Sequence, residues 1–291
     1  MTTTDAPGLT LSALTLRTAS FGERVRAAAQ AGFTGIGLAV HQYRQARAEG
    51  WTDARMAALL AESGVRLTEV ELLRHWARPQ RYDERRRSAD DTVFHIAEAF
   101  GARRVNAGMF DEHPYQDLVD GLRTATERAE RAGAVLGLEF MPFSGIRDLA
   151  LAARVVAAVR SAGPAGAASP GLILDAWHLT RGRTRPEEIA ALPPGAVVNV
   201  QLDDVLPTPL SDTLHEARHQ RQLPGEGAAD LTGLLRLLRR AGIEAPVSVE
   251  VLSDDLDARA PAETAARAYR TTCRVLATAA VAVGTGGGVE A

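Results

Sequence analysis

The feature that most constrains the fold is a regular alternation of short apolar runs with longer helical segments. Runs of strand type occur eight times, at residues 9–16, 35–40, 67–73, 104–109, 137–141, 171–176, 197–204 and 246–252. Most helical segments between them end at a glycine, as at Gly32 and Gly101, which is the usual way to close a short helix-to-strand loop. Eight β/α units predict a single-domain α/β protein, the (β/α)8 TIM barrel.

The barrel is expected to span residues 8–281, between flexible ends at residues 1–7 and 282–291. The stretch 206–223 is expected to be a long loop. The alternative architecture, a doubly wound open sheet, would need a glycine-rich phosphate loop after an early strand. The glycines of AGFTGIG precede the second strand, and GTGGG near residue 285 opens no helix, so the barrel is the prediction.

Composition and charge favour small-molecule chemistry. A chain of 291 residues that is 46% hydrophobic can bury a full core, and a formal net charge of −3 gives no general attraction to DNA or to an acidic membrane. No basic and apolar leader opens the sequence, and no apolar run of about 18 residues could cross a bilayer. We therefore expect a cytoplasmic protein with a small-molecule substrate and without nucleic-acid or membrane partners. A homodimer is left open.

Strand alternation predicts which side chains enter the barrel. In the run 197–204, successive side chains point to opposite faces. The apolar face holds Val198, Val200 and Leu202, and the polar face holds Asn199, Gln201 and Asp203. Because the apolar face must pack under helices, the polar face is expected to point inward.

The last four strands are thereby expected to aim polar groups at one another. The inward residues near their carboxyl ends are Glu139, Asp175, Gln201 and Glu250. Carboxylates that lie so near one another repel, and each loses hydration when it is buried. A divalent cation is therefore the natural compensation. An oxygen-rich ligand set favours one Mn²⁺ or Mg²⁺, with Co²⁺ and Zn²⁺ as the alternatives.

Five segments then carry a family resemblance over nearly the whole chain. They are LEF with Glu139, LDAWH with Asp175 and His178, VQLDD with Gln201, RQLPGEG with Arg221, and SVEV with Glu250. In this combination the sequence resembles the sugar phosphate isomerase/epimerase family of xylose isomerase-like barrels.

The resemblance implies roles for these residues. Glu139 and Glu250 would be both metal ligands and the catalytic acid/base pair, and Asp175 with the residue at position 201 would complete the coordination. His178 would act in catalysis by contacting a substrate oxygen. Arg221 would also contact a substrate oxygen, as a binding residue. Gln201 stands where the sugar epimerases usually have histidine, and it is similar to the dehydroshikimate and inosose dehydratase branches.

The chemistry of such a site is consistent with an isomerase or epimerase of a sugar or related polyhydroxy ketone. A metal at the substrate carbonyl lowers the cost of the enediolate formed when the α proton is removed. One glutamate would take this proton, and the other would return one to the opposite face or protonate a departing hydroxyl. A dehydratase of a cyclic keto-polyol, such as dehydroshikimate or inosose, is therefore the alternative.

Two other classes of protein are less consistent with the sequence. A barrel that only binds sugar or metal would not require two carboxylates on opposite sides of the substrate. An endonuclease for abasic DNA would need more imidazoles at the strand ends and a basic face, which Gln201 and the net charge of −3 disfavour.

The substrate wall opposite the metal is expected to come from the earlier strands. Its candidates follow the second, third and fourth runs, and they are His41, His75, Trp76 and Asn106.

Overall fold

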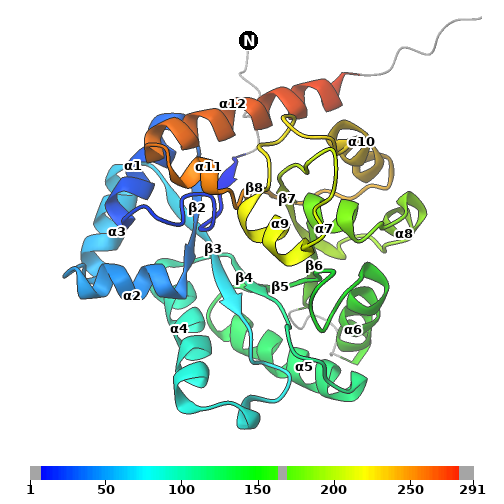
Figure 1. The fold of residues 1–291 in the computed structure, drawn as a ribbon. Coiled ribbons are helices and arrows are strands. Elements are labelled where there is room, and N and C mark those ends of the chain that lie inside the picture. The colour runs from blue at the N-terminus through cyan, green and yellow to red at the C-terminus, as the bar shows by residue number, and fades with distance from the viewer. Residues whose placement is uncertain (1–7, 163–168, 282–291) are drawn as a thin grey trace, which may run out of the picture.

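The computed structural model describes residues 8–162 and 169–281. Eight parallel strands form a closed barrel in sequence order, which confirms the predicted TIM barrel (Figure 1). The flexible ends predicted at residues 1–7 and 282–291 lie outside the described residues. The strands are β1 (Thr10–Leu11), β2 (Gly35–Ala39), β3 (Arg66–Leu73), β4 (Arg104–Ala107), β5 (Val135–Glu139), β6 (Gly171–Asp175), β7 (Val197–Leu202) and β8 (Val247–Val249).

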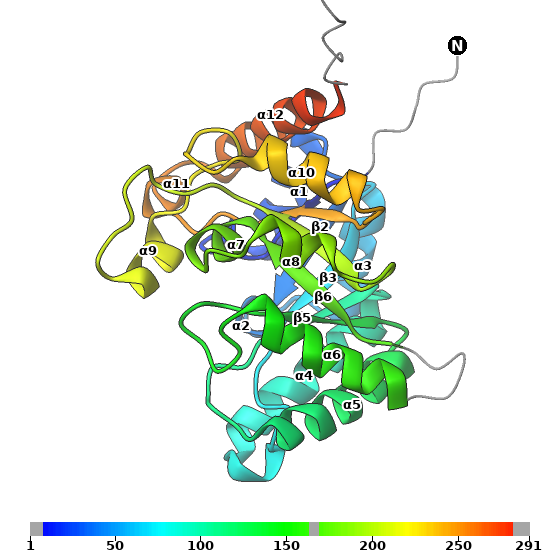
Figure 2. The same cartoon turned by 90° about the vertical axis from the view of Figure 1, so that its right-hand side faces the viewer.

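Helices surround the barrel and cover its outer face (Figure 2). They are α1 (Phe21–Ala31), α2 (Val40–Ala48), α3 (Asp53–Glu62), η1 (Pro79–Arg81), α4 (Glu84–Phe100), α5 (Tyr115–Arg131), α6 (Leu149–Ala162), α7 (Ala176–Arg181), α8 (Pro186–Ala190), α9 (Thr213–His219), α10 (Leu231–Arg240), α11 (Asp254–Asp257) and α12 (Pro261–Ala280). Within the described residues, no helix combines the length and the apolar character that a bilayer crossing demands.

The helix ends follow the expected capping chemistry. Ser20 caps the start of α1 in a capping box with Glu23, and α1 ends at Gly32, whose φ is 103°. Gly101 ends α4 in the same left-handed region, with a φ of 64°. The glycines predicted to close the helix-to-strand loops do so at these two positions.

The first strand is shorter than predicted. Only Thr10 and Leu11 pair in the sheet, although the apolar run extends over residues 9–16. The Ser12 N–H still donates to the Val249 carbonyl at 3.0 Å, and the chain then turns, since the Thr15 N–H donates to the Ser12 carbonyl at 3.3 Å. This turn leaves the Ser12 side chain at the rim of the barrel.

The prediction that Val198 faces the helices is wrong. The register between β6 and β7 shifts between Leu172 and Ile173, so β7 is irregular at its start. A Cβ added to Gly171 or Gly137, which share the inward face, would lie 2.3 Å or 3.2 Å from the methyl groups of Val198. Val198 therefore fills the barrel space that these glycines leave empty. Beyond the shift the alternation holds, and Asp175 pairs with Gln201.

A buried polar layer lies inside the barrel. Glu69 of β3 forms an ion pair with Arg104 of β4, and both side chains are buried. On the other side, the Asn199 amide donates to the Ser248 hydroxyl at 2.8 Å. Polar groups this deep need partners, and these contacts provide most of them.

The stretch 206–223, predicted to be a loop, contains helix α9. Asp212 caps this helix by accepting from the His215 N–H at 2.9 Å. Arg17 fastens its end, because it donates to the Arg218 carbonyl at 2.6 Å and pairs with Asp254 at 2.7 Å. The segment is therefore held at the carboxyl end of the barrel.

The close fit at β6 and β7 gives a prediction about stability. Gly171→Ala should lower the free energy of unfolding by about 1–3 kcal/mol, because its new methyl would collide with Val198 and with the Ala196 carbonyl. Val198→Ala should restore part of this loss when it is combined with Gly171→Ala, a coupling that urea denaturation of the four proteins of the cycle would measure. Purely additive effects would show that the two side chains do not compete for one space.

Candidate active site

A cavity of about 670 Å³ opens at the carboxyl ends of the strands, where barrel enzymes have their active sites. Its acidic and imidazole lining includes Glu71, Glu139, His178 and Glu250. The volume suits a small organic ligand.

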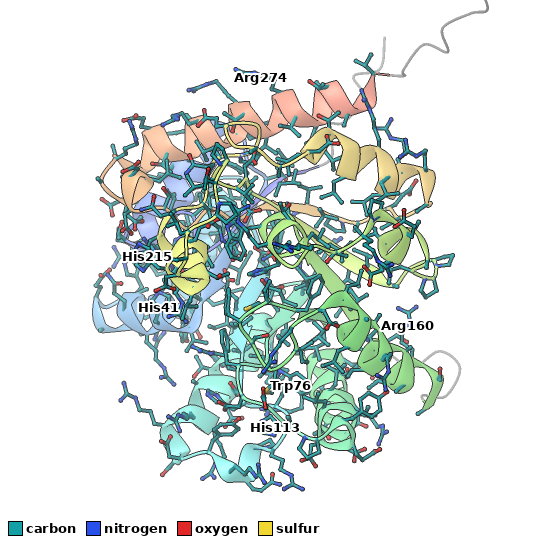
Figure 3. All side chains as sticks on the ribbon, turned by 45° about the vertical axis from the view of Figure 1, so that its right-hand side comes forward. His41, Trp76, His113, Arg160, His215 and Arg274 are labelled. Atoms are coloured by element: carbon teal, nitrogen blue, oxygen red, sulfur yellow. The ribbon has the colours of Figure 1, made fainter. Side chains whose placement is uncertain are left out.

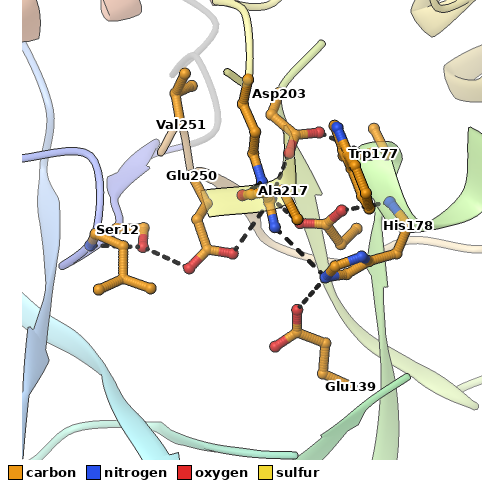
Figure 4. A network of polar contacts seen from close by, with 12 residues as sticks. Ser12, Glu139, Trp177, His178, Asp203, Ala217, Glu250 and Val251 are labelled. Carbon is orange, nitrogen blue, oxygen red and sulfur yellow. Dashed lines mark hydrogen bonds and ion pairs between the residues drawn. The ribbon is translucent and has the colours of Figure 1, made fainter. Parts of the chain in front are cut away.

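Of the carboxylates predicted at the strand ends, Glu139 and Glu250 line this cavity, and Asp175 lies close to Glu139. Glu139 ends β5, Asp175 ends β6 and Glu250 follows β8, and each is at most 5% exposed. His178 of α7 reaches the same point, with its Nε2 3.2 Å from Glu139 Oε1 (Figure 4). One ligand atom each from Glu139, Asp175 and His178 lie within 4.8 Å of one another, a group that could hold a metal ion.

Asp175 is placed by the start of α7. Its Oδ1 caps this helix by accepting from the His178 N–H at 2.7 Å. Its Oδ2 accepts from Arg221 Nη1, also at 2.7 Å. Both oxygens are thus oriented before any ligand arrives.

Arg221 is the positive charge at the centre of the acidic cluster. Its Nη1 also lies 2.5 Å from Asp203 Oδ2 and 3.9 Å from Glu250 Oε2. Its Nε donates to the Ala217 carbonyl at 2.8 Å. Arg221 was predicted to contact substrate, and it does line the cavity. The structure adds that its guanidinium orients Asp175 and Asp203.

The surroundings shift the acidities of these groups. Burial, with the Asp175 charge added, raises the pKa of Glu139 to about 8. Burial and the neighbouring Glu139 raise the pKa of Glu250 well above its usual value. Burial acts on Asp175 in the same direction, but Arg221 and His178 lower its pKa below the ordinary value. Burial lowers the pKa of His178 to about 4, so the imidazole is neutral at pH 7.

Gln201 supplies the test of whether a metal fits. Its side chain is fully buried, and neither its Oε1 nor its Nε2 has a hydrogen-bond partner among the described residues. An unpartnered buried amide is costly, and a cation bound by Oε1 would relieve that cost. Together with Glu139, Asp175 and Glu250, Gln201 provides the oxygen donors that a divalent ion prefers. The group of Glu139, Asp175 and His178 therefore fits a divalent ion, and Gln201 and Glu250 stay predicted ligands beside it.

Sequence reasoning missed Glu71 and Ser12. Glu71 of β3 is 3% exposed and lines the cavity. The Ser12 hydroxyl lies 3.2 Å from Glu71 Oε1 and 3.1 Å from Glu250 Oε1. One hydroxyl hydrogen cannot be donated fully to both carboxylates, so a proton on one of the two acids would complete these contacts. Burial and the nearby Glu250 raise the pKa of Glu71 well above its usual value, in agreement with this.

A usable signal for Glu71 was present. Alternation in the run 67–73 places Glu69 and Glu71 on one face, as it does for the polar residues of the run 197–204. No comparable signal marks Ser12, because its position depends on the turn that ends β1 early.

The predicted substrate wall is only partly assembled. His75 lines the cavity, with its Nδ1 3.2 Å from Asp90 Oδ1 and its ring against Tyr82 at a centroid distance of 4.5 Å. His41 lies in α2 and is exposed at the cavity edge.

Trp76 and Asn106 are not brought to this cavity. The Trp76 indole donates to the Gly108 carbonyl at 2.9 Å, and Trp76 lines a separate hollow between α4 and α5. Its position is labelled in Figure 3. Asn106 is fully buried, pairs in register with Gly137, two residues before Glu139, and accepts from Arg104 at 3.1 Å. It belongs to the polar layer beneath the site, so the prediction that these two residues contact substrate is not supported.

A closed parallel barrel with an acidic cluster at the carboxyl ends of its strands defines the class, an α/β barrel of the enzyme type. The chain belongs to the family described as xylose isomerase-like TIM barrel, whose profile matches residues 25–276. This confirms the resemblance inferred from the sequence. Its members include epimerases, isomerases and dehydratases.

Individual relatives include a curated protein and two solved structures. The chain is 35% identical over 137 residues to a 3-dehydroshikimate dehydratase of Pseudomonas aeruginosa, a stretch that is 47% of this chain and 21% of that protein. The structure of IOLI with a binding zinc atom has a TM-score of 0.80 at 19% identity, covering 93% of this chain and 98% of that one. An L-ribulose 3-epimerase has a TM-score of 0.69 at 15% identity, with 94% and 96% covered. The two structural likenesses establish the fold.

The shifted acidities predict how the stability of the metal-free protein depends on pH. Folded Glu139 keeps a proton that the unfolded chain releases, so it makes stability fall as pH rises from about 4.5 to about 8. His178 acts oppositely, but only between its folded pKa of about 4 and its ordinary 6.5. From pH 6.5 to about 8 only the destabilising effect of Glu139 remains of these two. The melting temperature of metal-free protein should therefore fall over this window.

Thermal melts in chelator-treated buffers would measure this slope. Glu139→Gln is the matched control, because its amide has no proton to lose, and its slope should be flatter. A melting temperature that rises from pH 6.5 to 8 in the parent protein would contradict the prediction.

Proposed function

We propose that this protein is a divalent-metal-dependent isomerase or epimerase that removes a proton next to the carbonyl of a sugar or related polyhydroxy ketone. The observation that supports this most is the buried group of Glu139, Asp175 and His178, whose ligand atoms lie within 4.8 Å of one another, with the unpartnered amide of Gln201 in register with Asp175. Glu250 lines the same cavity as Glu139. The proposed ligands are Glu139, Asp175, Gln201 and Glu250, and Mn²⁺ or Mg²⁺ is the favoured ion. When bound, such an ion polarises the substrate carbonyl and makes the neighbouring proton more acidic.

The two glutamates provide the proton transfers. Glu139 ends β5, and Glu250 directly follows β8. These strands lie on different sides of the closed barrel, and both glutamates line the same cavity. In the proposed reaction Glu250 accepts the α proton, and Glu139 on the other side of the substrate supplies one. A barrel that only bound its ligand would not require two carboxylates on different sides of the substrate.

His178 and Arg221 position and polarise the substrate. His178 is neutral, so it can donate only one hydrogen, and its Nε2 faces Glu139 across the floor of the cavity. A substrate oxygen near this atom would accept that hydrogen as negative charge develops on it. Arg221 keeps Asp175 ionised and in place for the metal.

A dehydratase is the second candidate, and two observations favour it. Gln201 is similar to the dehydroshikimate and inosose dehydratase branches, and a curated relative at 35% identity is a 3-dehydroshikimate dehydratase. Both reactions begin with the same proton abstraction. In a dehydratase, the second acid protonates a departing hydroxyl instead of returning a proton to carbon.

The first test combines metal analysis with deuterium exchange. Protein loaded with Mn²⁺ should bind one ion per chain, and it should exchange an α proton of a ketose, an inosose or dehydroshikimate in D₂O. An epimerised product would identify the isomerase, and an unsaturated product would identify the dehydratase. Protein that binds no divalent ion would contradict the proposal.

Glu250→Gln should keep the fold and most of the metal affinity but lower turnover at least about 10²-fold, because an amide oxygen can still bind a cation but cannot accept a proton. The matched control is Glu244→Gln, an exposed glutamate just before the same strand, which should keep full activity. Exchange and turnover rates at saturating metal would measure the effect. A Glu250→Gln variant with nearly the parent rate would exclude Glu250 as the base.

His178→Ala should lower kcat by about 10² to 10³ and leave metal affinity within a few-fold, as expected for the loss of one donor to a developing oxyanion. Asp175→Asn should instead weaken metal binding. Calorimetric titration with Mn²⁺ beside turnover assays would separate the two effects. If His178→Ala loses metal affinity as strongly as Asp175→Asn, His178 is a ligand, and if it loses only thermal stability, it is structural.

A further inference from the structure

The mouth of the cavity is cationic, in contrast to its acidic floor. Four arginines from separate segments line it, namely Arg44 of α2, Arg74 after β3, Arg85 of α4 and Arg218 of α9. The chain as a whole carries a net charge of −3, so this gathering is local. The proposed reaction at the floor does not use any of these residues.

Arg74 is fixed but unpaired. Its guanidinium lies over the Phe110 ring at 4.3 Å, and Phe110 lines the same cavity. The nearby carboxylate of Asp90 is already engaged by the His75 ring and by the backbone N–H groups of Arg74 and His75. Within residues 8–162 and 169–281, Arg74 forms no ion pair, so its N–H donors are available to the cavity.

Arg218 brings a second positive charge from another segment. Its backbone carbonyl is held by Arg17, which itself pairs with Asp254, so the helix that carries Arg218 is anchored. Arg74 and Arg218 line the same cavity. Burial and then the charge of Arg218 lower the pKa of Arg74, against the smaller opposing effect of Asp90 and Asp111. Like charges that the fold holds near one another are relieved by an anion between them.

Several surface arginines of this protein are paired with carboxylates. Arg17 pairs with Asp254 and Asp257, and Arg267 pairs with Glu226. By contrast, Arg85 and Arg218 have no carboxylate partner in the described part of the chain. Arg44 has only long contacts, to Ser88 at 3.4 Å and to Thr92 at 3.3 Å. The convergence of four such arginines from separate segments on one cavity therefore points to a ligand.

We infer that Arg74 and Arg218, supported by Arg44 and Arg85, form an anion subsite, and that the substrate is a polyhydroxy ketone bearing a carboxylate or phosphate group. The guanidinium fork binds both of these groups through paired N–H donors. The ketone half of this inference rests on the proposed function, whereas the anion subsite rests on the arginines alone. The anionic group binds at the mouth, and the reacting carbonyl lies at the acidic floor.

The test uses equilibrium binding of probes that lack a ketone and so are not turned over. Quinate is compared with its methyl ester, and D-arabinitol 5-phosphate with D-arabinitol, by calorimetric titration at low ionic strength. At least one anionic probe should bind about 10-fold or more tightly than its neutral partner, which corresponds to one strong charged contact. A preference in the first pair identifies a sugar acid as the substrate class, and one in the second pair identifies a sugar phosphate.

Arginine variants decide whether the subsite is responsible. Arg74→Gln and Arg218→Gln should each reduce the anion preference about 5-fold or more, as the loss of one charged contact implies. Arg66→Gln is the matched control, because Arg66 is exposed at the opposite end of the same strand that precedes Arg74. Equal binding within both pairs would overturn the inference, as would an Arg66→Gln effect as large as that of Arg74→Gln.

Repeating the titrations with Glu250→Gln keeps this test separate from the proposed function. The anion preference should persist in that variant, because Arg74 and Arg218 are intact. An anion preference without α-proton exchange would leave the subsite standing and refute the proposed reaction. Exchange on neutral ketoses without any anion preference would support the proposed reaction and refute the anion subsite.

Discussion

The interaction on which the site depends is the repulsion among carboxylates buried at one end of the barrel. Glu71, Glu139, Asp175, Asp203 and Glu250 are all nearly inaccessible to solvent. A single guanidinium, that of Arg221, lies among three of them. One positive charge cannot neutralise them all, so the remaining acids either hold protons or need a cation. The raised proton affinities and the fit to a divalent ion are two expressions of the same excess of negative charge.

The barrel creates this excess by its geometry. Parallel strands that close on themselves bring their carboxyl ends to one rim, and side-chain alternation turns every second residue inward. Asp175 shows how local structure adds precision, since one of its oxygens caps α7 and the other binds Arg221. The polar layer of Glu69, Arg104 and Asn199 beneath the site places hydrogen-bonding groups where an apolar core would otherwise lie.

Much of this arrangement could be predicted from the sequence, because it follows from periodicity. Eight β/α units predict the barrel, and parity predicts that Glu139, Asp175, Gln201 and Glu250 point inward at the same end. Parity fails where the backbone leaves the regular pleat. The register shift in β7 turns Val198 inward, and the early turn after β1 brings Ser12 to the rim, and neither irregularity has a local sequence signal.

The difference between the predicted and the observed positions of Trp76 and Asn106 has a related cause. A residue that follows a strand can face the cavity or the helical layer, and the difference depends on the path of the loop. His75 turns toward the cavity because Asp90 of α4 holds its ring and its backbone, while the next residue, Trp76, turns away to reach the Gly108 carbonyl. Such choices depend on partners distant in the sequence.

The separation of charge along the cavity has a consequence for how a substrate can enter. Arginines at the mouth and carboxylates at the floor create a field that orients a molecule with one anionic end. Such a molecule enters with its uncharged hydroxyl and carbonyl groups leading, because its anion is attracted at the mouth and repelled by the floor. A divalent ion at the floor would reduce that repulsion but would leave the arginines unpaired. The same charges that favour a cation at the floor therefore also favour a substrate whose own charge is far from the reacting carbon.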